Sequence, residues 1–278
     1  MSGTAVDAVQ LTAEPSQLIV DPRGAVVRQW SVAGERILRP MPDGSSDPLQ
    51  SACYPLVPFS SRISEGRFAW QGQDVQLPPM PPAAPHALHG FGWRALWTVE
   101  ERSETRTTFA WLHKGGDWPW SFEARQTFAL TPRAFVMTLS VNNLDKTPMP
   151  LGLGLHPHFP GTPTLEISAE GLWTADYDDP IPQRLVPFDG TLPDPVDHCL
   201  TGWSGEAVLR WPDRIVRLTA TPPLGHLHIY APRGRAFLCA EPVSHAPDAL
   251  NRAPAEMIAL APGETVSASA RIEVLPPR

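Results

Sequence analysis

Proline density is the feature that most restricts the fold of this chain. The sequence has 34 prolines among 278 residues, more than twice the ordinary share of about 5%. Because proline removes a backbone N–H donor and clashes with the preceding helical turn, long helices are disfavoured. The chain is 42% hydrophobic, with ten Trp and ten Phe, so it can bury a large core and disorder is excluded. Short strands separated by prolines are expected, and the predicted fold class is all-β.

Alternating apolar and polar residues mark individual strands. In the clearest runs every second residue is apolar, with a single interruption at Gln126. Because successive side chains of a strand point to opposite faces, this alternation places one set against a core and the other toward solvent or a second layer. The pair Gly115-Gly116, flanked by such runs, predicts a hairpin. These runs are 122–130, 135–141, 216–221 and 266–274.

The chain shows no division into domains. A proline-rich stretch at 77–85 has the composition of a linker, but the strand pattern on both sides of it is of one kind. It is better interpreted as a long loop that crosses one face. We therefore predict one domain, residues 1–278, folded as a large two-layer antiparallel β-sandwich.

Charge, cysteines and the N-terminus limit the partners and the compartment. The net charge of −7 counts against a nucleic-acid-binding surface. Cys53, Cys199 and Cys239 are widely spaced and odd in number, so they predict neither a disulfide framework nor a CxxC metal site. The N-terminus lacks a secretory signal pattern, and no apolar run approaches the ~20 residues that cross a bilayer. The expectation is a soluble cytoplasmic protein with no nucleic-acid or membrane partner and an undefined oligomeric state.

Polar side chains that could perform chemistry gather in four places. Each has an ordinary explanation as well: a strand-end charge for Arg62, a self-bonded loop at 86–93, and a solvated carboxylate for Glu241. A carboxylate at the end of a buried strand is nevertheless costly unless it is paired or used. The four places are 58–63 with Arg62, 86–93 with His86 and His89, 154–159 with His156 and His158, and 197–199 together with 240–242, which carry Asp197 and Glu241.

The sequence favours proton transfer without a cofactor. His156 and His158 would share a face of a strand, but no Asp or Glu lies at a spacing that completes a metal set, so no metal is expected. Histidine combined with a carboxylate suits general acid–base chemistry near neutral pH. The chain contains no G-x-S-x-G elbow, P-loop or dinucleotide fingerprint, which removes the cofactor and nucleophile classes that those motifs mark.

Taken in order along nearly the whole chain, these segments resemble the aldose 1-epimerase (mutarotase) family. Four matches carry the resemblance: Pro58-Phe59-Ser60-Ser61-Arg62-Ile63, Leu88-His89-Gly90, Gly154-Leu155-His156-Pro157-His158-Phe159, and Glu241-Pro242 followed by Pro247-Asp248-Ala249. The resemblance implies a galactose mutarotase-like supersandwich, an isomerase of carbohydrate metabolism, and a small sugar as the substrate.

The resemblance also implies residue roles. Glu241 would take the proton from the anomeric hydroxyl as the base, and His156 would protonate the ring oxygen as the acid. Arg62, His89 and Asp197 would bind sugar hydroxyls. His86 and Trp93 are added as substrate-binding candidates, because both flank His89 in the sequence and an indole can stack on a pyranose.

Some positions depart from the family pattern. Ser61 stands where many members have Asn, His86 also replaces an Asn, and tyrosine is frequent where His158 stands. These departures leave the particular sugar undefined. Three alternatives follow: a hexose-6-phosphate 1-epimerase of the same fold, using Arg62 and Arg94 on the phosphate; a sugar-binding protein without turnover; and a cupin-like metalloprotein with further ligands near His156 and His158.

Overall fold

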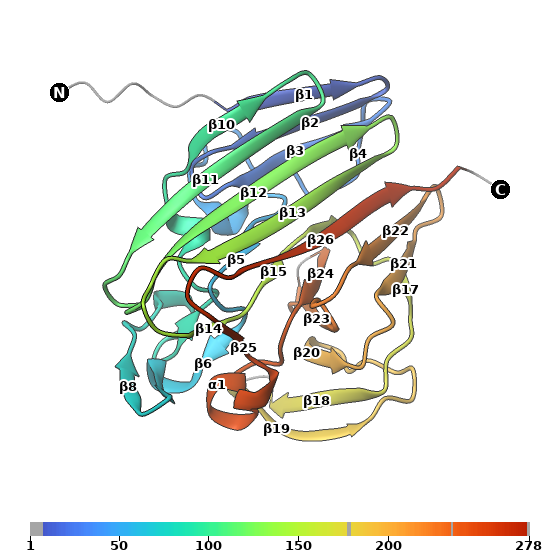
Figure 1. Ribbon diagram of the computed structural model, residues 1–278. Helices are drawn as coiled ribbons and strands as arrows, with labels where there is room; N and C mark the ends of the chain where they lie inside the picture. Colours follow the sequence, from blue (N-terminus) through green and yellow to red (C-terminus); the bar gives the residue numbers. More distant parts are fainter. Residues whose placement is uncertain (1–7, 177–178, 235, 277–278) are drawn as a thin grey trace.

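The computed structural model describes residues 8–176, 179–234 and 236–276. It is nearly all β, and its antiparallel sheets confirm the predicted sandwich (Figure 1). The one α-helix among these residues, α1 (Ala249–Arg252), has four residues. The other helical segments in this part of the chain are single 3-10 turns, which agrees with the effect of proline. They are η1 (Pro48–Gln50), η2 (Ser64–Gly66), η3 (Pro81–Ala83), η4 (Gly92–Arg94) and η5 (Pro254–Glu256).

The first of two large sheets holds the long strands at the front of Figure 1. Its strands, in spatial order, are β10 (Thr98–Arg102), β11 (Arg106–Lys114), β12 (Ser121–Thr131), β13 (Ala134–Asn143), β26 (Thr265–Val274), β22 (Ile215–Ala220), β21 (Glu206–Arg210) and β17 (Thr164–Ile167). All four alternating runs form strands, as predicted, and the structure places these strands, β12, β13, β22 and β26, in this one sheet. The Gly115-Gly116 hairpin is also confirmed, since β11 and β12 pair from Lys114 opposite Ser121.

The second large sheet carries three of the polar candidates, His158, Asp197 and Glu241. Its order is β19 (Asp179–Pro187), β18 (Gly171–Asp176), β20 (Val196–Thr201), β23 (His226–Ala231), β24 (Phe237–Val243), β15 (Gly154–Leu155) and β5 (Pro55–Leu56), and β16 (His158–Pro160) also pairs with β24.

Smaller sheets complete the fold. A four-stranded sheet contains β1 (Val9–Ala13), β2 (Ser16–Asp21), β3 (Val26–Val32) and β4 (Glu35–Arg36). Three pairs are formed by β6 (Arg62–Ile63) with β9 (Ala87–Leu88), β7 (Arg67–Trp70) with β8 (Gln73–Gln76), and β14 (Met149–Leu151) with β25 (Ile258–Leu260).

The core lies between the two large sheets. Phe122, Met137 and Ile272 from the first sheet join Leu227 and Ile229 from the second in one buried hydrophobic cluster. Since side chains alternate along a strand, the residues between the core positions of the second sheet point to its opposite face. That face carries the functional candidates.

Two further sequence predictions can be compared with the fold. Cys53, Cys199 and Cys239, for which no disulfide framework was expected, are free and buried. Among the described residues, no helix combines the length and the apolar character that a membrane span requires. The single-domain organisation stays a prediction.

Candidate active site

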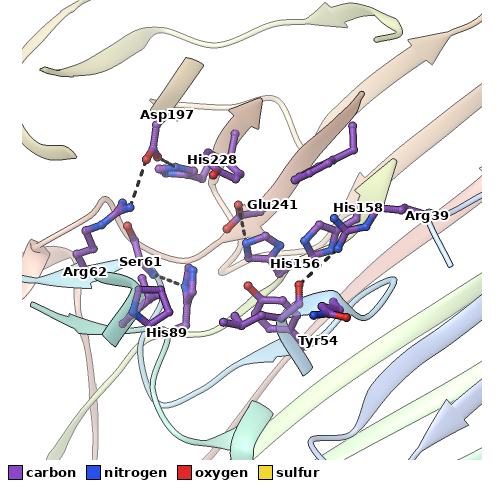
Figure 2. Close-up of a pocket in the computed structure, with 16 residues that line it drawn as sticks. Arg39, Tyr54, Ser61, Arg62, His89, His156, His158, Asp197, His228 and Glu241 are labelled. Atoms are coloured by element: carbon purple, nitrogen blue, oxygen red, sulfur yellow. Dashed lines mark hydrogen bonds and ion pairs between the residues drawn. The ribbon is translucent and has the colours of Figure 1, made fainter. Parts of the chain in front are cut away.

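A cavity of about 390 Å³ opens on the outer face of the second sheet (Figure 2). This volume is within the ~300–1,000 Å³ that is typical of small-molecule sites. The cavity is lined by Arg39, Leu49, Gln50, Tyr54, Ser61, Arg62, Pro82, Leu88, His89, His156, His158, Asp197, His228, Tyr230, Phe237 and Glu241.

Strand register brings the polar side chains together. On β24, Ala240 belongs to the core cluster while Glu241 lines the cavity. On β23, Leu227 and Ile229 face the core and His228 lies between them, directly opposite Glu241 in the pairing of the two strands. The next strand, β20, places Asp197 at the same face. Three adjacent strands therefore present a carboxylate, an imidazole and a second carboxylate to one space.

The centre of the site is a buried pair of His156 and Glu241. His156 Nε2 lies 3.1 Å from Glu241 Oε1, and both side chains are buried. Burial raises the pKa of Glu241 to about 8, although the positive charges of His228 and Arg62 oppose the rise. Burial also lowers the pKa of His156 well below its usual value, with the neighbouring histidines adding to the effect. Such a pair shares one proton near neutral pH, so it can both accept and donate a proton.

Asp197 is the charged anchor at the other end of the cavity. The ring N–H of His228 donates to Asp197 Oδ1 over 2.7 Å, and Arg62 lies 3.4 Å from the other oxygen (Figure 2). Burial opposes ionisation of Asp197, but the hydrogen bond from His228 and the charges of His228 and Arg62 outweigh it and lower its pKa to about 2. For His228, burial is outweighed by the same hydrogen bond and by nearby carboxylates, so its pKa is raised.

The backbone fixes the tautomer of His89. The N–H of Ser61 donates to His89 Nδ1 over 3.0 Å, so the ring proton resides on Nε2 when the imidazole is neutral. Burial and the positive charge of Arg62 lower the pKa of His89 well below its usual value, which keeps it neutral. His89 therefore offers the cavity an N–H donor without a charge.

Two groups of side chains could hold a metal ion. His89, His156 and Glu241 form one, and His156, His158 and Cys239 form the other; within each group the ligand atoms lie within 4.8 Å of one another. The sequence argument missed both because it looked for a third ligand near His158 in the chain. The pairing of β16 with β24 supplies Cys239 instead, directly opposite His158.

The structure brings together five of the seven predicted site residues: Glu241, His156, Arg62, His89 and Asp197 line the same cavity. The other two do not. His86 lies outside it, where its Nδ1 accepts a hydrogen bond from the N–H of Glu65 over 3.1 Å. Trp93 is only 2% exposed.

Trp93 thus requires a correction. Its indole packs against Tyr54, with ring centroids 5.9 Å apart, in a small hydrophobic cluster beside the site. Because the Trp93 side chain is almost completely buried, neither face of its ring is free to stack on a sugar. Trp93 instead supports the wall of the cavity through its contact with Tyr54. Arg94, considered for a phosphate group, also lies outside the lining.

Several lining residues were missed or underrated from the sequence. His228 lies in none of the four polar segments of the sequence, and only the register with Glu241 singles it out. Arg39 and Tyr54 had no local signal. The guanidinium of Arg39 lies 4.4 Å from the centroid of the Phe237 ring, and Tyr54 stacks on His156 at 4.4 Å with an interplanar angle of 22°.

Comparisons with known proteins find similarity along nearly the whole chain. A model of the aldose 1-epimerase family matches residues 7–273. The uncharacterized Escherichia coli (strain K12) protein YphB is 32% identical over 280 residues, covering 93% of this chain and 95% of YphB.

Solved structures show the same sandwich. An Escherichia coli K12 protein, provisionally assigned as an aldose 1-epimerase, superposes with a TM-score of 0.88 at 29% identity and covers 97% of this chain and 99% of its own. The GalM/aldose epimerase homologue from C. elegans superposes with a TM-score of 0.83 at 15% identity, over 99% of this chain and 100% of its own. The second likeness concerns the fold alone.

Proposed function

Because the chain belongs to the aldose 1-epimerase family, we propose that it interconverts the α and β anomers of a free aldose by opening and reclosing the sugar ring. One observation carries this proposal. A buried His156–Glu241 pair with a 3.1 Å contact lies at the wall of a cavity of monosaccharide scale. Anomer exchange needs one group that removes a proton and one that delivers a proton, and this pair provides both.

In the proposed mechanism, the pair reacts in the form that has its shared proton on His156: Glu241 removes the proton of the anomeric hydroxyl while His156 protonates the ring oxygen. The bond between C1 and the ring oxygen breaks, and C1 becomes the carbonyl carbon of the open-chain aldehyde. After rotation about the C1–C2 bond, the ring hydroxyl attacks the other face of C1. His156 recovers its proton from that hydroxyl, and Glu241 returns its proton to the carbonyl oxygen. No proton, electron or cofactor is consumed.

The surrounding groups would bind the sugar. The ionised Asp197 can accept hydrogen bonds from ring hydroxyls, while Arg62 and the Nε2–H of His89 can donate to them. Since Asp197 is already held by His228 and Arg62, it is fixed before the substrate arrives. A fixed carboxylate loses little conformational freedom when it binds.

The alternatives are separated by polarimetry of freshly dissolved α-D-glucose, α-D-galactose and α-D-glucose 6-phosphate. We expect the protein to accelerate the approach to anomeric equilibrium for a free sugar. Acceleration with the phosphorylated sugar alone would favour the hexose-6-phosphate epimerase, and binding without acceleration of any sugar would favour the sugar-binding protein.

Two variants test the proposed residues. Glu241→Gln and His156→Asn should each lower kcat/KM by ~10²-fold or more, the usual contribution of a positioned base or acid. The matched control is Glu35→Gln, which makes the same carboxylate-to-amide change on an exposed side chain of β4. Wild-type rates in a folded Glu241→Gln protein would rule out Glu241 as the base.

A further inference from the structure

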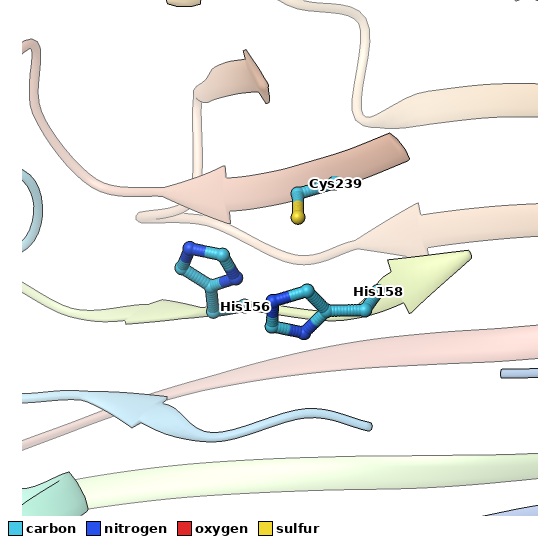
Figure 3. Close-up of side chains that lie close together, drawn as sticks. All are labelled: His156, His158 and Cys239. Carbon is cyan, nitrogen blue, oxygen red and sulfur yellow. The ribbon is translucent and has the colours of Figure 1, made fainter. Parts of the chain in front are cut away.

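His156, a member of the acid–base pair, lies close to His158 and Cys239 (Figure 3). His158 and Cys239 face each other across the pairing of β16 with β24, and the two imidazoles stack with centroids 4.7 Å apart. His156 is 5% exposed, His158 4% and Cys239 0%. Two imidazoles and one thiol, with ligand atoms within 4.8 Å of one another, are therefore enclosed at one edge of the cavity.

Both imidazoles have a nitrogen that the rest of the described chain does not use. His156 Nε2 contacts Glu241, whereas Nδ1 of His156 and Nδ1 of His158 are buried without a hydrogen-bond partner among the described residues. Buried polar atoms are nearly always paired in folded proteins. The unpaired Nδ1 of His156 is the atom through which this ring can bind an ion without giving up its contact with Glu241.

We propose that His156, His158 and Cys239 bind a zinc ion, and that the bound ion switches off the acid–base pair. Zinc prefers imidazole and thiolate ligands in a tetrahedral set, and a site with three protein ligands leaves the fourth position open. The cavity gives an ion access to the cluster, because His156 and His158 both line it. The nitrogen and sulfur donors disfavour Mg²⁺ and Ca²⁺, which prefer oxygen. On binding, the Cys239 thiol and the His156–Glu241 pair each release one proton to the buffer, and the thiolate and Nδ1 of His156 coordinate the ion.

The effect on catalysis rests on the proposed function. An imidazole whose Nδ1 lone pair is held by zinc cannot accept a second proton, so His156 can no longer act as the acid. Its Nε2–H then donates to Glu241, which is the common arrangement of a metal-bound histidine with a supporting carboxylate. Zinc is thus a reversible inhibitor, and the reaction itself needs no ion.

Metal binding is tested on the full chain after treatment with EDTA. Titration calorimetry with Zn²⁺ should give one ion per chain, and Co²⁺ should give the thiolate-to-metal charge-transfer absorption of a cysteine ligand. Cys239→Ser should abolish that absorption and weaken zinc binding by at least about tenfold. Cys199→Ser, which alters another fully buried thiol, is the matched control and should keep both signals. Absence of zinc binding by the wild type, or identical signals in a folded Cys239→Ser protein, would overturn the site.

The ratio of mutarotation rates with and without Zn²⁺ tests the inhibition. We expect inhibition in the wild type that EDTA reverses, and a ratio near one for Cys239→Ser at the same zinc concentration. Equal inhibition of both proteins would contradict the proposal. If the protein binds zinc through Cys239 but accelerates no sugar, the metal site stands and the proposed function fails, so the two failures are distinguishable.

Discussion

Tyr54 packs face to face on the imidazole of His156, with ring centroids 4.4 Å apart and planes 22° from parallel. Tyr54 is itself buried beside Trp93. This contact restricts the rotation of the His156 ring and so keeps Nε2 directed at Glu241. Tyr54 is therefore a positioning residue, because it acts on the reacting atoms through His156.

Removal of the aromatic ring tests this positioning role. Tyr54→Leu should lower kcat by about tenfold or more, since small displacements of a catalytic group are costly, and KM should change much less. Tyr54→Phe keeps the stacked ring and should restore kcat. The measurement is a full rate–concentration curve for each variant. A change confined to KM, or a Phe variant as poor as the Leu variant, would contradict this role.

Ionisation of the Asp197 carboxylate in the site makes the stability of the fold depend on pH in acid. Its pKa of about 2 lies below the ordinary value of 3.8 for an aspartate, so its ionisation stabilises the fold above pH 3.8 and the benefit is lost as the pH falls toward 2. The shift corresponds to about 2 kcal/mol. Urea unfolding of the wild type and Asp197→Asn between pH 2 and pH 6 should show a difference that shrinks with acidity. A difference independent of pH would refute this linkage.

Within a strand, the alternation of side chains between the two faces decides which residues enter the core and which line the cavity. On β24, Leu238 and Ala240 join the core cluster while Glu241 lines the cavity. A slip of one residue in the pairing would exchange the two faces of the strand. The apolar residues of β24 therefore fix the position of Glu241 as firmly as its polar contacts do.

Gln126 breaks this rule on β12. It is 0% exposed on the apolar face of the strand, and its amide atoms have no hydrogen-bond partner among the described residues. An unpaired buried amide costs about 1–3 kcal/mol. Gln126→Met, which has a similar shape, should therefore raise the free energy of unfolding by at least about 1 kcal/mol, as measured by urea denaturation. Gln126→Glu is the opposite control and should destabilise the fold; a less stable Met variant would argue against an unpaired amide.

In the whole molecule, the cavity depends on loops that dock on distant segments. Gly90, next to His89, has a φ of +66°, and a Cβ there would overlap the carbonyl oxygen of Val57. The loop therefore reaches its position only without a side chain at this site. Through this close approach the fold delivers His89 to the cavity that Asp197, His228 and Glu241 of the second sheet also line.

Two glycine-to-alanine variants distinguish the steric overlap with Val57 at Gly90 from the backbone strain of a positive φ alone. Gly72 has a φ of +85° and open space around it, so Gly72→Ala should cost only the ~1 kcal/mol of a left-handed alanine. Gly90→Ala should lose more stability and also raise KM, because it displaces His89. Thermal unfolding and sugar kinetics of both variants provide the comparison. Equal effects in the two variants would mean that the contact with Val57 is unimportant.

The sequence by itself determined the all-β class, the long strands of the first sheet and the absence of long helices, because proline content and period-two alternation act locally along the chain. Its motifs, through their resemblance to a family, also indicated Glu241 and His156 as a pair. Only the tertiary structure decided that Trp93 is enclosed and His86 lies outside, that His228 faces Glu241, and that Cys239 lies opposite His158. Those relations depend on the register between strands far apart in the chain and on loop docking, and local residue patterns do not encode either.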